Sequence, residues 1–549
     1  MVPVWRSKIR SALGLRSRMD PNFCGLVAFV AVYLAYGVWQ LPVLTDWISS
    51  AVDEGYTSYA AQRIREGDWP HRDFFFLWTP GTAYFHAALQ EIGLEWVGER
   101  AASLLAACAS SLVVLGFARD WKMSAGDRAL LMLLLFGWSF TLWNIPYSSW
   151  YAVLLGLIAI RLLPRSLVFA GLFFGLAFWF KQNVGILAFC GAAAWLVLEK
   201  RSREVLRLAL PFAVVLLLPF TAMLIWGGSE ALLQAVRQIF LFPLRYPSLM
   251  GIFPEKSQLS APLTAFGLWI LSLFFLRSRS SQRSAGLLQF GLLVYIGIYA
   301  FQSSSRFVHG AFILLSLLAW PLSLTVEALK GDREGLSRFL LVWLPGFGVF
   351  LQAFPRADFQ HFLFVFPLTA LILLRTFSTL RQRYDFLAAG WVRLPVLLLI
   401  AGGFFLQIQV LRTHRLGQVD ALGRISYSLP YRLNEEVIAV RRFLLRQGLA
   451  EGGPLLVLPN ATSVYRWTGF RNPTPHQQFF PGYVESYGVR ESNVLTTYRE
   501  RGGKYLVVQE RSGLEENNPE IAAEIDRDYE ELKRFPEYFT IYGPRSRQP

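Results

Sequence analysis

The chain has 549 residues, of which 54% are hydrophobic and only 17% are charged. A soluble chain of this length would carry about 25% charged residues and divide into several domains. The net charge of +15 would suit a nucleic-acid-binding protein, but most Lys and Arg lie in short loops between apolar runs, as in the cytoplasmic loops of membrane proteins. The composition therefore excludes a soluble enzyme and argues against nucleic acid as a partner.

Apolar runs of about 17–22 residues recur between residues 23 and 412. Each run can cross roughly 30 Å of hydrocarbon as a helix, which satisfies its backbone polar groups internally. The sequence therefore predicts an α-helical polytopic membrane protein with about 13 transmembrane helices, and the distribution of Lys and Arg places its N-terminus in the cytoplasm. The predicted spans are residues 23–42, 98–118, 128–143, 149–163, 166–180, 184–198, 208–227, 261–276, 285–301, 307–326, 339–354, 361–376 and 391–411.

The long loop 43–97 between the first two spans is predicted to lie outside the cytoplasm. It carries two adjacent carboxylates, Asp53 and Glu54, and then an amphipathic stretch over 56–66 that we expect to be helical. Residues 74–92 are apolar but interrupted by Pro80 and Gly81, which favours an interfacial segment over a span.

The residues after the last span have a different composition. Residues 413–549 are more polar and predict a small extracytoplasmic α/β domain, separate from the transmembrane domain 1–412. Leu455–Leu458 and Tyr505–Val508 are typical of buried strands, and 434–446 and 520–533 of helices. The chain has three cysteines, all in apolar runs, so neither disulfides nor thiolate metal sites are expected.

Asp53 and Glu54 allow three interpretations. They could be solvated loop residues, which is the ordinary role of acids in an outer loop. A carboxylate placed there could instead take a proton from an acceptor hydroxyl as that hydroxyl attacks an electrophile. The pair could also hold a divalent cation through oxygen ligands.

Cationic and polar side chains gather where other spans reach the outer face. Lys181 and Gln182 follow one span, and Arg306, Arg356 and His361 lie at later outer turns. Such groups could anchor span ends at the interface, and Arg356 could simply pair with Asp358. They could equally bind the phosphate of a lipid-linked substrate, because ionisable groups at a membrane boundary are costly without a partner.

Three stretches together resemble the GT-C superfamily of membrane glycosyltransferases, which use polyprenyl-phosphate sugars. They are Asp53-Glu54, the segment GDWPHRDFFFLWTPG at 67–81, and GLAFWFKQ at 175–182. Within this superfamily, the chain resembles the dolichyl-phosphate-mannose-protein mannosyltransferases and bacterial glycosyltransferase family 39. It departs from the lipid A aminoarabinose transferases, which have Lys-Pro-Pro after the first loop where this chain has Trp78-Thr79-Pro80-Gly81.

This resemblance implies a GT-C fold and an inverting transferase in the bacterial plasma membrane, acting on a lipid, glycan or protein acceptor outside the cytoplasm. Asp53 would be the base, and Glu54 would support it or share a Mg²⁺ or Mn²⁺ ion with it; no cofactor is certain. The implied ligands of the donor phosphate are Lys181, Gln182, Arg306, Arg356 and His361. The implied contacts to the remaining substrate are Tyr59, Arg72, Asp73 and Arg245.

Two other classes of function remain open from the sequence. A transporter or flippase of lipid-linked glycans would use the same basic outer face without a base, but it should show symmetric halves, which the sequence does not. A structural membrane subunit is the third class.

Overall fold

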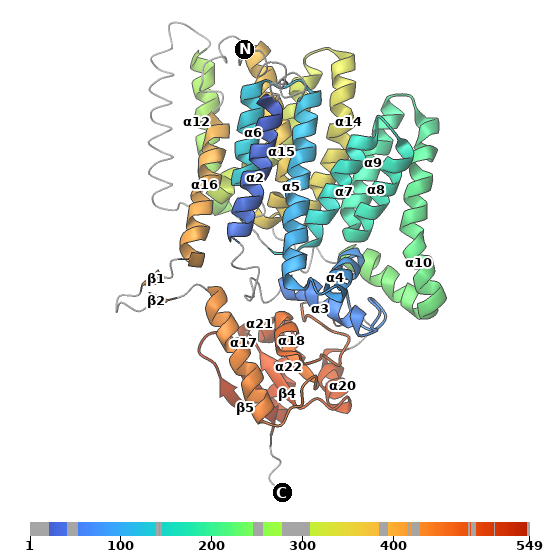
Figure 1. The fold of residues 1–549 in the computed structure, drawn as a ribbon, viewed down its shortest axis with the longest axis vertical. Coiled ribbons are helices and arrows are strands. Elements are labelled where there is room, and N and C mark those ends of the chain that lie inside the picture. Colours follow the sequence, from blue (N-terminus) through green and yellow to red (C-terminus); the bar gives the residue numbers. More distant parts are fainter. Residues whose placement is uncertain are drawn as a thin grey trace, which may run out of the picture.

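The computed structural model of the protein describes residues 21–40, 53–138, 142, 145–244, 256–276, 308–383, 394–415, 418–419, 425–426, 429–480, 484, 490–509 and 511–545. Long helices run alongside one another as a bundle, and a smaller mixed domain lies beyond one end of it (Figure 1). The bundle helices are α2 (Pro21–Gln40), α5 (Trp96–Asp120), α6 (Ala125–Gly137), α7 (Ser148–Leu162), α8 (Leu167–Phe180), α9 (Gln182–Leu198), α10 (Val205–Val236), α12 (Lys256–Leu276), the helix Val308–Ala328, α14 (Arg333–Phe350), α15 (Phe359–Arg383) and α16 (Leu394–Arg415).

Every predicted span that falls on described residues coincides with one of these helices, whereas the predicted span 285–301 lies outside the described residues. Five helical segments of the described chain are long and apolar enough to cross a membrane by themselves, and shorter apolar helices accompany them. The protein is thus a multi-pass membrane protein, and the predicted total of spans stays a prediction. The five segments are Trp96–Asp120, Ser202–Leu244, Val308–Ala328, Arg333–Ala353 and Phe359–Gln382.

Glycines allow neighbouring helices of the bundle to approach closely. A Cβ atom on Gly191 of α9 would lie 2.3 Å from the carbonyl oxygen of Leu344 in α14, and one on Gly348 of α14 would lie 2.3 Å from that of Leu187 in α9. No real side chain tolerates such distances, so only glycine fits at these two positions. Small residues at helix contacts are the usual means of packing membrane helices, because lipid supplies no hydrophobic drive for their association.

Two short helices lie at the end of the bundle that faces the mixed domain: α3 (Asp53–Arg65) and α4 (Gly81–Glu91) (Figure 1). The predicted amphipathic helix is therefore confirmed, but it starts earlier and has Asp53 and Glu54 in its first turn. Negative side chains are favoured at that end, where the helix dipole is positive. Residues 74–92 are not one segment, because only α4 is helical and an aromatic stretch precedes it.

The domain beyond the bundle contains a four-stranded sheet in the order β3-β4-β6-β5. Strand β3 (Leu455–Leu458) is parallel to β4 (Tyr505–Val508), whereas β6 (Thr540–Pro544) is antiparallel to both β4 and β5 (Tyr529–Arg534). The helices of the domain are α17 (Leu429–Arg446), α18 (Ser463–Thr468), α20 (Val494–Glu500), α21 (Arg511–Asn517) and α22 (Pro519–Asp528). Between α16 and α17, two-residue strands β1 (Gln418–Val419) and β2 (Ile425–Ser426) pair with each other.

Both predicted strands and the first predicted helix of this domain are confirmed, but the predicted helix 520–533 is wrong in its second half. Helix α22 ends at Asp528, and Tyr529–Arg534 form the edge strand β5. The charged sequence of β5 suits a helix locally, yet pairing with β6 decides its conformation, since strand formation depends on the neighbouring strand more than on local preference.

Candidate active site

Asp53 is the first residue of α3 and lies half-buried where α3 meets the bundle. It interacts electrostatically with Arg356 and Asp358, which follow α14 in a loop some 300 residues later. Burial raises the pKa of the Asp53 carboxyl from 3.8 to about 6; Arg356 offsets part of that rise and Asp358 adds to it. A carboxylate with this pKa is ionised at neutral pH and is more basic than an ordinary aspartate.

Lys181 occupies the turn between α8 and α9 and is only 6% exposed. Its Nζ donates to Ser149 Oγ at 2.8 Å and to Gln352 Oε1 at 2.7 Å, and lies 5.7 Å from the centre of the Tyr147 ring. Because these contacts are to neutral oxygens and a ring face, burial lowers the pKa of the Lys181 ammonium group from 10.5 to about 7; Asp358 offsets part of that fall and Arg356 adds to it.

The loop before α15 and the first turn of α15 supply three more charged or ionisable groups. Arg356 Nε lies 3.4 Å from Asp358 Oδ2, and His361 Nδ1 lies 2.6 Å from Asp358 Oδ1. Burial alone would raise the pKa of Asp358, but its bonds with His361 and the charge of Arg356 keep that pKa below its usual value. Lys181 also interacts electrostatically with Asp358 and Arg356, so the structure brings Asp53, Lys181, Arg356 and His361 into one site.

One amide side chain connects the two cationic parts of this site. Gln352 is 1% exposed and accepts hydrogen bonds from both Lys181 Nζ and Ser149 Oγ, the latter at 3.1 Å. Its Nε2 donates to the carbonyl oxygen of His361 at 3.3 Å. Gln352 thereby fixes the lysine relative to the start of α15.

The Glu54 carboxylate binds elsewhere and is not part of the site formed by Asp53, Lys181 and Arg356. Its carboxylate accepts a 2.5 Å hydrogen bond from Arg100 Nε of α5, and both side chains are completely buried. In the described part of the chain, no group of three or more His, Cys, Asp or Glu residues is arranged to hold a metal ion. Because Arg100 occupies Glu54, the residues around Asp53 do not fit a divalent cation shared by the two acids. The structure gives Glu54 a role in attaching α3 to α5.

Two further predicted ligands are used for packing. The Gln182 amide is engaged by backbone groups of Leu77, Thr79 and Ile239, each at 3.4 Å, so it holds the aromatic loop and is not directed at a phosphate. Tyr59 is fully buried and its hydroxyl accepts from the Asn472 backbone N–H at 2.8 Å, which leaves no surface for a substrate.

Arg72 and Asp73 pair with each other at 2.7 Å and are about one-third exposed on the loop after α3. No described contact joins them to Asp53, so their predicted contact with a substrate stays a prediction. Arg245 and Arg306 lie outside the described residues.

Aromatic rings pack beside Lys181 and His361. Trp78 contacts Tyr147 edge-on at 5.0 Å, and Tyr147 stacks on Phe364 at 5.2 Å. Tyr56 stacks on Phe76 at 5.1 Å, while its hydroxyl accepts from the Leu77 backbone N–H. The Tyr147 ring lies against both Lys181 and His361, and such apolar surroundings strengthen electrostatic interactions.

The sequence analysis missed Ser149, Gln352 and Arg100. Gln352 interrupts one apolar span, and Arg100 lies near the start of another. Polar side chains in such spans are costly unless paired. That cost is the signal that could have identified them. Ser149 carries no such signal, since serine is common in membrane helices.

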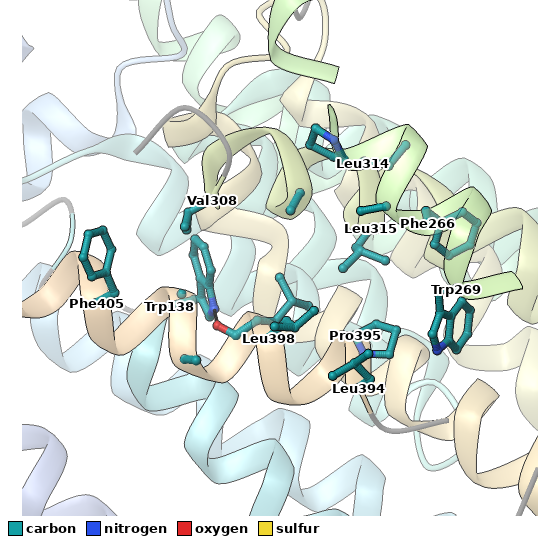
Figure 2. A pocket seen from close by; sticks show the side chains of 16 residues that line it. Trp138, Phe266, Trp269, Val308, Leu314, Leu315, Leu394, Pro395, Leu398 and Phe405 are labelled. Carbon is teal, nitrogen blue, oxygen red and sulfur yellow. Dashed lines mark hydrogen bonds between the residues drawn. The ribbon is translucent and has the colours of Figure 1, made fainter. Parts of the chain in front are cut away.

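A separate apolar cavity of about 260 Å³ lies among α12, α16 and the helix Val308–Ala328 (Figure 2). Trp138, Val308 and Phe405 lie toward one end of it and Trp269 and Leu394 toward the other, and the Trp138 indole N–H donates to the Leu399 carbonyl at 2.8 Å. Its lining is almost entirely hydrocarbon, so it can accommodate only apolar groups.

Solved structures with similar folds include an oligosaccharyltransferase and ArnT. The structure of an oligosaccharyltransferase from Archaeoglobus fulgidus, in complex with Zn and sulfate, matches with a TM-score of 0.49 and 11% identity, over 94% of this chain and 73% of that chain. ArnT from Cupriavidus metallidurans, bound to undecaprenyl phosphate, matches with a TM-score of 0.42 and 15% identity, over 94% and 97%.

Both proteins are glycosyltransferases of the GT-C superfamily, which the sequence motifs of this chain also resemble. No family model matches the chain, and no curated protein does.

Proposed function

We propose that the protein transfers a sugar from a polyprenyl-phosphate-linked donor to an acceptor hydroxyl outside the cytoplasm, with inversion at the anomeric carbon. The observation that carries this proposal is a single half-buried site that combines a carboxylate of raised pKa, Asp53, with two basic side chains, Lys181 and Arg356. A base beside an anion-binding group is what transfer from a sugar phosphate needs.

Asp53 would act as the general base. Its ionised carboxylate accepts the proton of the acceptor hydroxyl while the hydroxyl oxygen forms a bond to the anomeric carbon. A pKa of about 6 keeps the group ionised at neutral pH and close to the basicity at which proton transfer is most effective.

Lys181 and Arg356 would stabilise the leaving group. As the bond between the sugar and the phosphate oxygen breaks, negative charge grows on that oxygen, and polyprenyl phosphate departs as the anion. Because Ser149 and Gln352 already hold the lysine in place, little reorganisation is needed at that moment. His361, held by Asp358, would add a ring near the same phosphate.

The membrane setting supports a lipid-linked donor. The site lies at the end of the bundle next to α3 and the mixed domain (Figure 1), where a polyprenyl donor would present its phosphate while its chain stays among the helices. We further propose that this end faces away from the cytoplasm, in a bacterial plasma membrane. No step of this mechanism passes through a metal ion.

A reconstituted transfer assay tests the proposal. Purified protein in lipid nanodiscs would receive polyprenyl-phosphate sugars labelled in the sugar, together with an extract of envelope glycans and lipids. We expect label to move to an acceptor with wild type and with Glu91→Gln, an exposed acid of α4, but not with Asp53→Asn. Full transfer by Asp53→Asn would refute the assignment of the base.

A further inference from the structure

Tyr59 of α3 is a core residue of the mixed domain that begins some 370 residues later. Its ring is fully buried and stacks on Tyr465 of α18, with centres 4.6 Å apart and planes 21° apart. The Tyr465 hydroxyl accepts from the Val457 backbone N–H in β3 at 2.7 Å. Tyr59 and Tyr465 share one hydrophobic cluster with residues of α17, β3 and β6, so the core of this domain includes a side chain from the first outer loop.

The contact between α3 and the mixed domain extends along α3 and into the loop that follows. A Cβ on Gly55 would lie 2.1 Å from the backbone nitrogen of Ser463, so the two backbones touch just two residues after Asp53. Further along, Arg63 Nη1 donates to the Thr474 carbonyl at 3.1 Å, and the Phe75 backbone N–H donates to the Pro475 carbonyl at 2.8 Å.

A second contact between the two parts involves the first turn of α5. Arg466 of α18 pairs with Glu95 at 2.7 Å, and Trp467 stacks on Trp96 with ring centres 5.6 Å apart. The mixed domain therefore touches the start of the same helix whose Arg100 binds Glu54.

A neighbouring side of α3 is held by α4 and α5. Glu54 binds Arg100, and one turn later Ser58 Oγ donates to Glu99 Oε1 at 3.1 Å. The side chain of Gln90 donates to the Ser58 carbonyl at 3.0 Å and to Glu99 at 2.7 Å. With nine of its thirteen residues buried, α3 is held from two sides.

We propose that the mixed domain positions Asp53, and that the Tyr59–Tyr465 pair is the main side-chain link between that domain and α3, beside the backbone contact of Gly55 with Ser463. The consequence for catalysis rests on the function proposed above, whereas the link itself can be tested without it. Tyr59 and Tyr465 are positioning residues in this account: neither touches the reacting atoms, and both act through the backbone of α3. If the mixed domain were joined to the bundle only through α16, one side of α3 would be exposed to solvent. Instead, nine of the thirteen residues of α3 are buried.

The test compares two tyrosines of the same domain. Tyr465→Leu removes the ring that stacks on Tyr59. Tyr498→Leu removes an equally buried ring on the opposite side of the sheet, whose hydroxyl donates to the Tyr505 carbonyl and whose cluster does not include α3. Hydrogen–deuterium exchange would be measured on peptides covering 53–65 in the full-length protein in nanodiscs, and kcat and KM would be measured in the transfer assay.

We expect Tyr465→Leu to speed exchange of α3 by about tenfold or more, since α3 would open locally more often. It should also lower kcat by about tenfold with little change in KM for the donor, because Asp53 would reach the productive position less often. Tyr465→Phe keeps the ring and should restore both values. Tyr498→Leu should leave α3 exchange and kcat near wild type.

Two results would overturn the proposal: equal acceleration of α3 exchange by both leucine variants, or faster exchange in Tyr465→Leu with an unchanged kcat. The first would mean that only the stability of the domain matters, and the second that α3 does not need the domain to place Asp53. If wild type transfers no sugar from any donor, the proposed function fails instead, and the exchange comparison still decides whether the domain holds α3.

Discussion

Because the Glu54–Arg100 pair is buried, the loss of folding free energy on removing Arg100 can be predicted. Both side chains are 0% exposed and their nearest atoms are 2.5 Å apart. Arg100→Met removes the cation, fills similar space and leaves the Glu54 carboxylate buried without that partner. Breaking a buried pair by removing one member costs about 3–5 kcal/mol. Solvent screening does not reduce this value, because neither group reaches water.

An exposed pair in the same region provides the matched control. Arg65 and Glu91 are 2.9 Å apart but 33% and 71% exposed, so Arg65→Met should cost about 1 kcal/mol or less. The double variant Glu54→Gln/Arg100→Met removes both buried charges and should recover most of the stability lost in Arg100→Met.

The assay is thermal unfolding of the full-length protein in nanodiscs, followed by the fraction that remains monodisperse after heating, together with the transfer rate. We expect Arg100→Met to unfold at the lowest temperature and to lose transfer, because α3 carries Asp53. If Arg100→Met is as harmless as Arg65→Met, or if the double variant is no better than the single one, the account of how α3 is attached is wrong.

Four more predictions follow from the site and from α3. Burial raises the pKa of Asp53 from 3.8 to about 6, so kcat/KM should fall as the pH drops below about 6, and a flat profile between pH 5 and 8 would contradict its role as base. Because the folded-state pKa is raised, stability is lost as the pH rises through this range, and Asp53→Asn should therefore raise the unfolding temperature at pH 8 but not at pH 4. Lys181→Met should lower kcat by about 10²–10³, and Lys181→Arg should not restore it, since a planar guanidinium does not fit a site built around a compact ammonium. Gly55→Ala should cost about 1–3 kcal/mol, because its Cβ would lie 2.1 Å from the Ser463 nitrogen, whereas Gly25→Ala, with nothing within 4 Å, should be tolerated in the same thermal assay.

The sequence was sufficient to predict the elements and part of the site. Long apolar runs predict helices because a membrane allows few other structures, and the alternation of basic loops predicts which turns share a face. That reasoning placed Asp53, Lys181, Arg356 and His361 at one side of the membrane. The structure shows that these four lie together.

The contacts that organise this site could not be predicted, because they join helices that are far apart in the sequence. Gln352 accepts a hydrogen bond from Lys181, which is 171 positions away in the sequence, and Arg100 donates one to Glu54, which is 46 positions away. Nothing local specifies such pairs. For Tyr59 and Gln182 the residue type suited substrate binding, but the structure uses both side chains to hold backbone segments together. Strand β5 was missed for the same reason, since its partner β6 defines it.

The most direct test of the central claim is mass spectrometry of envelope glycolipids and glycans from a deletion strain. The strain would be complemented at matched expression with wild type, Asp53→Asn or the control Glu91→Gln. The account predicts that one sugar is missing in the deletion strain, returns with wild type and Glu91→Gln, and stays missing with Asp53→Asn; this result would also identify the sugar and its acceptor. Full return of the sugar with Asp53→Asn would show that Asp53 is not the base and would favour transport of a lipid-linked glycan instead.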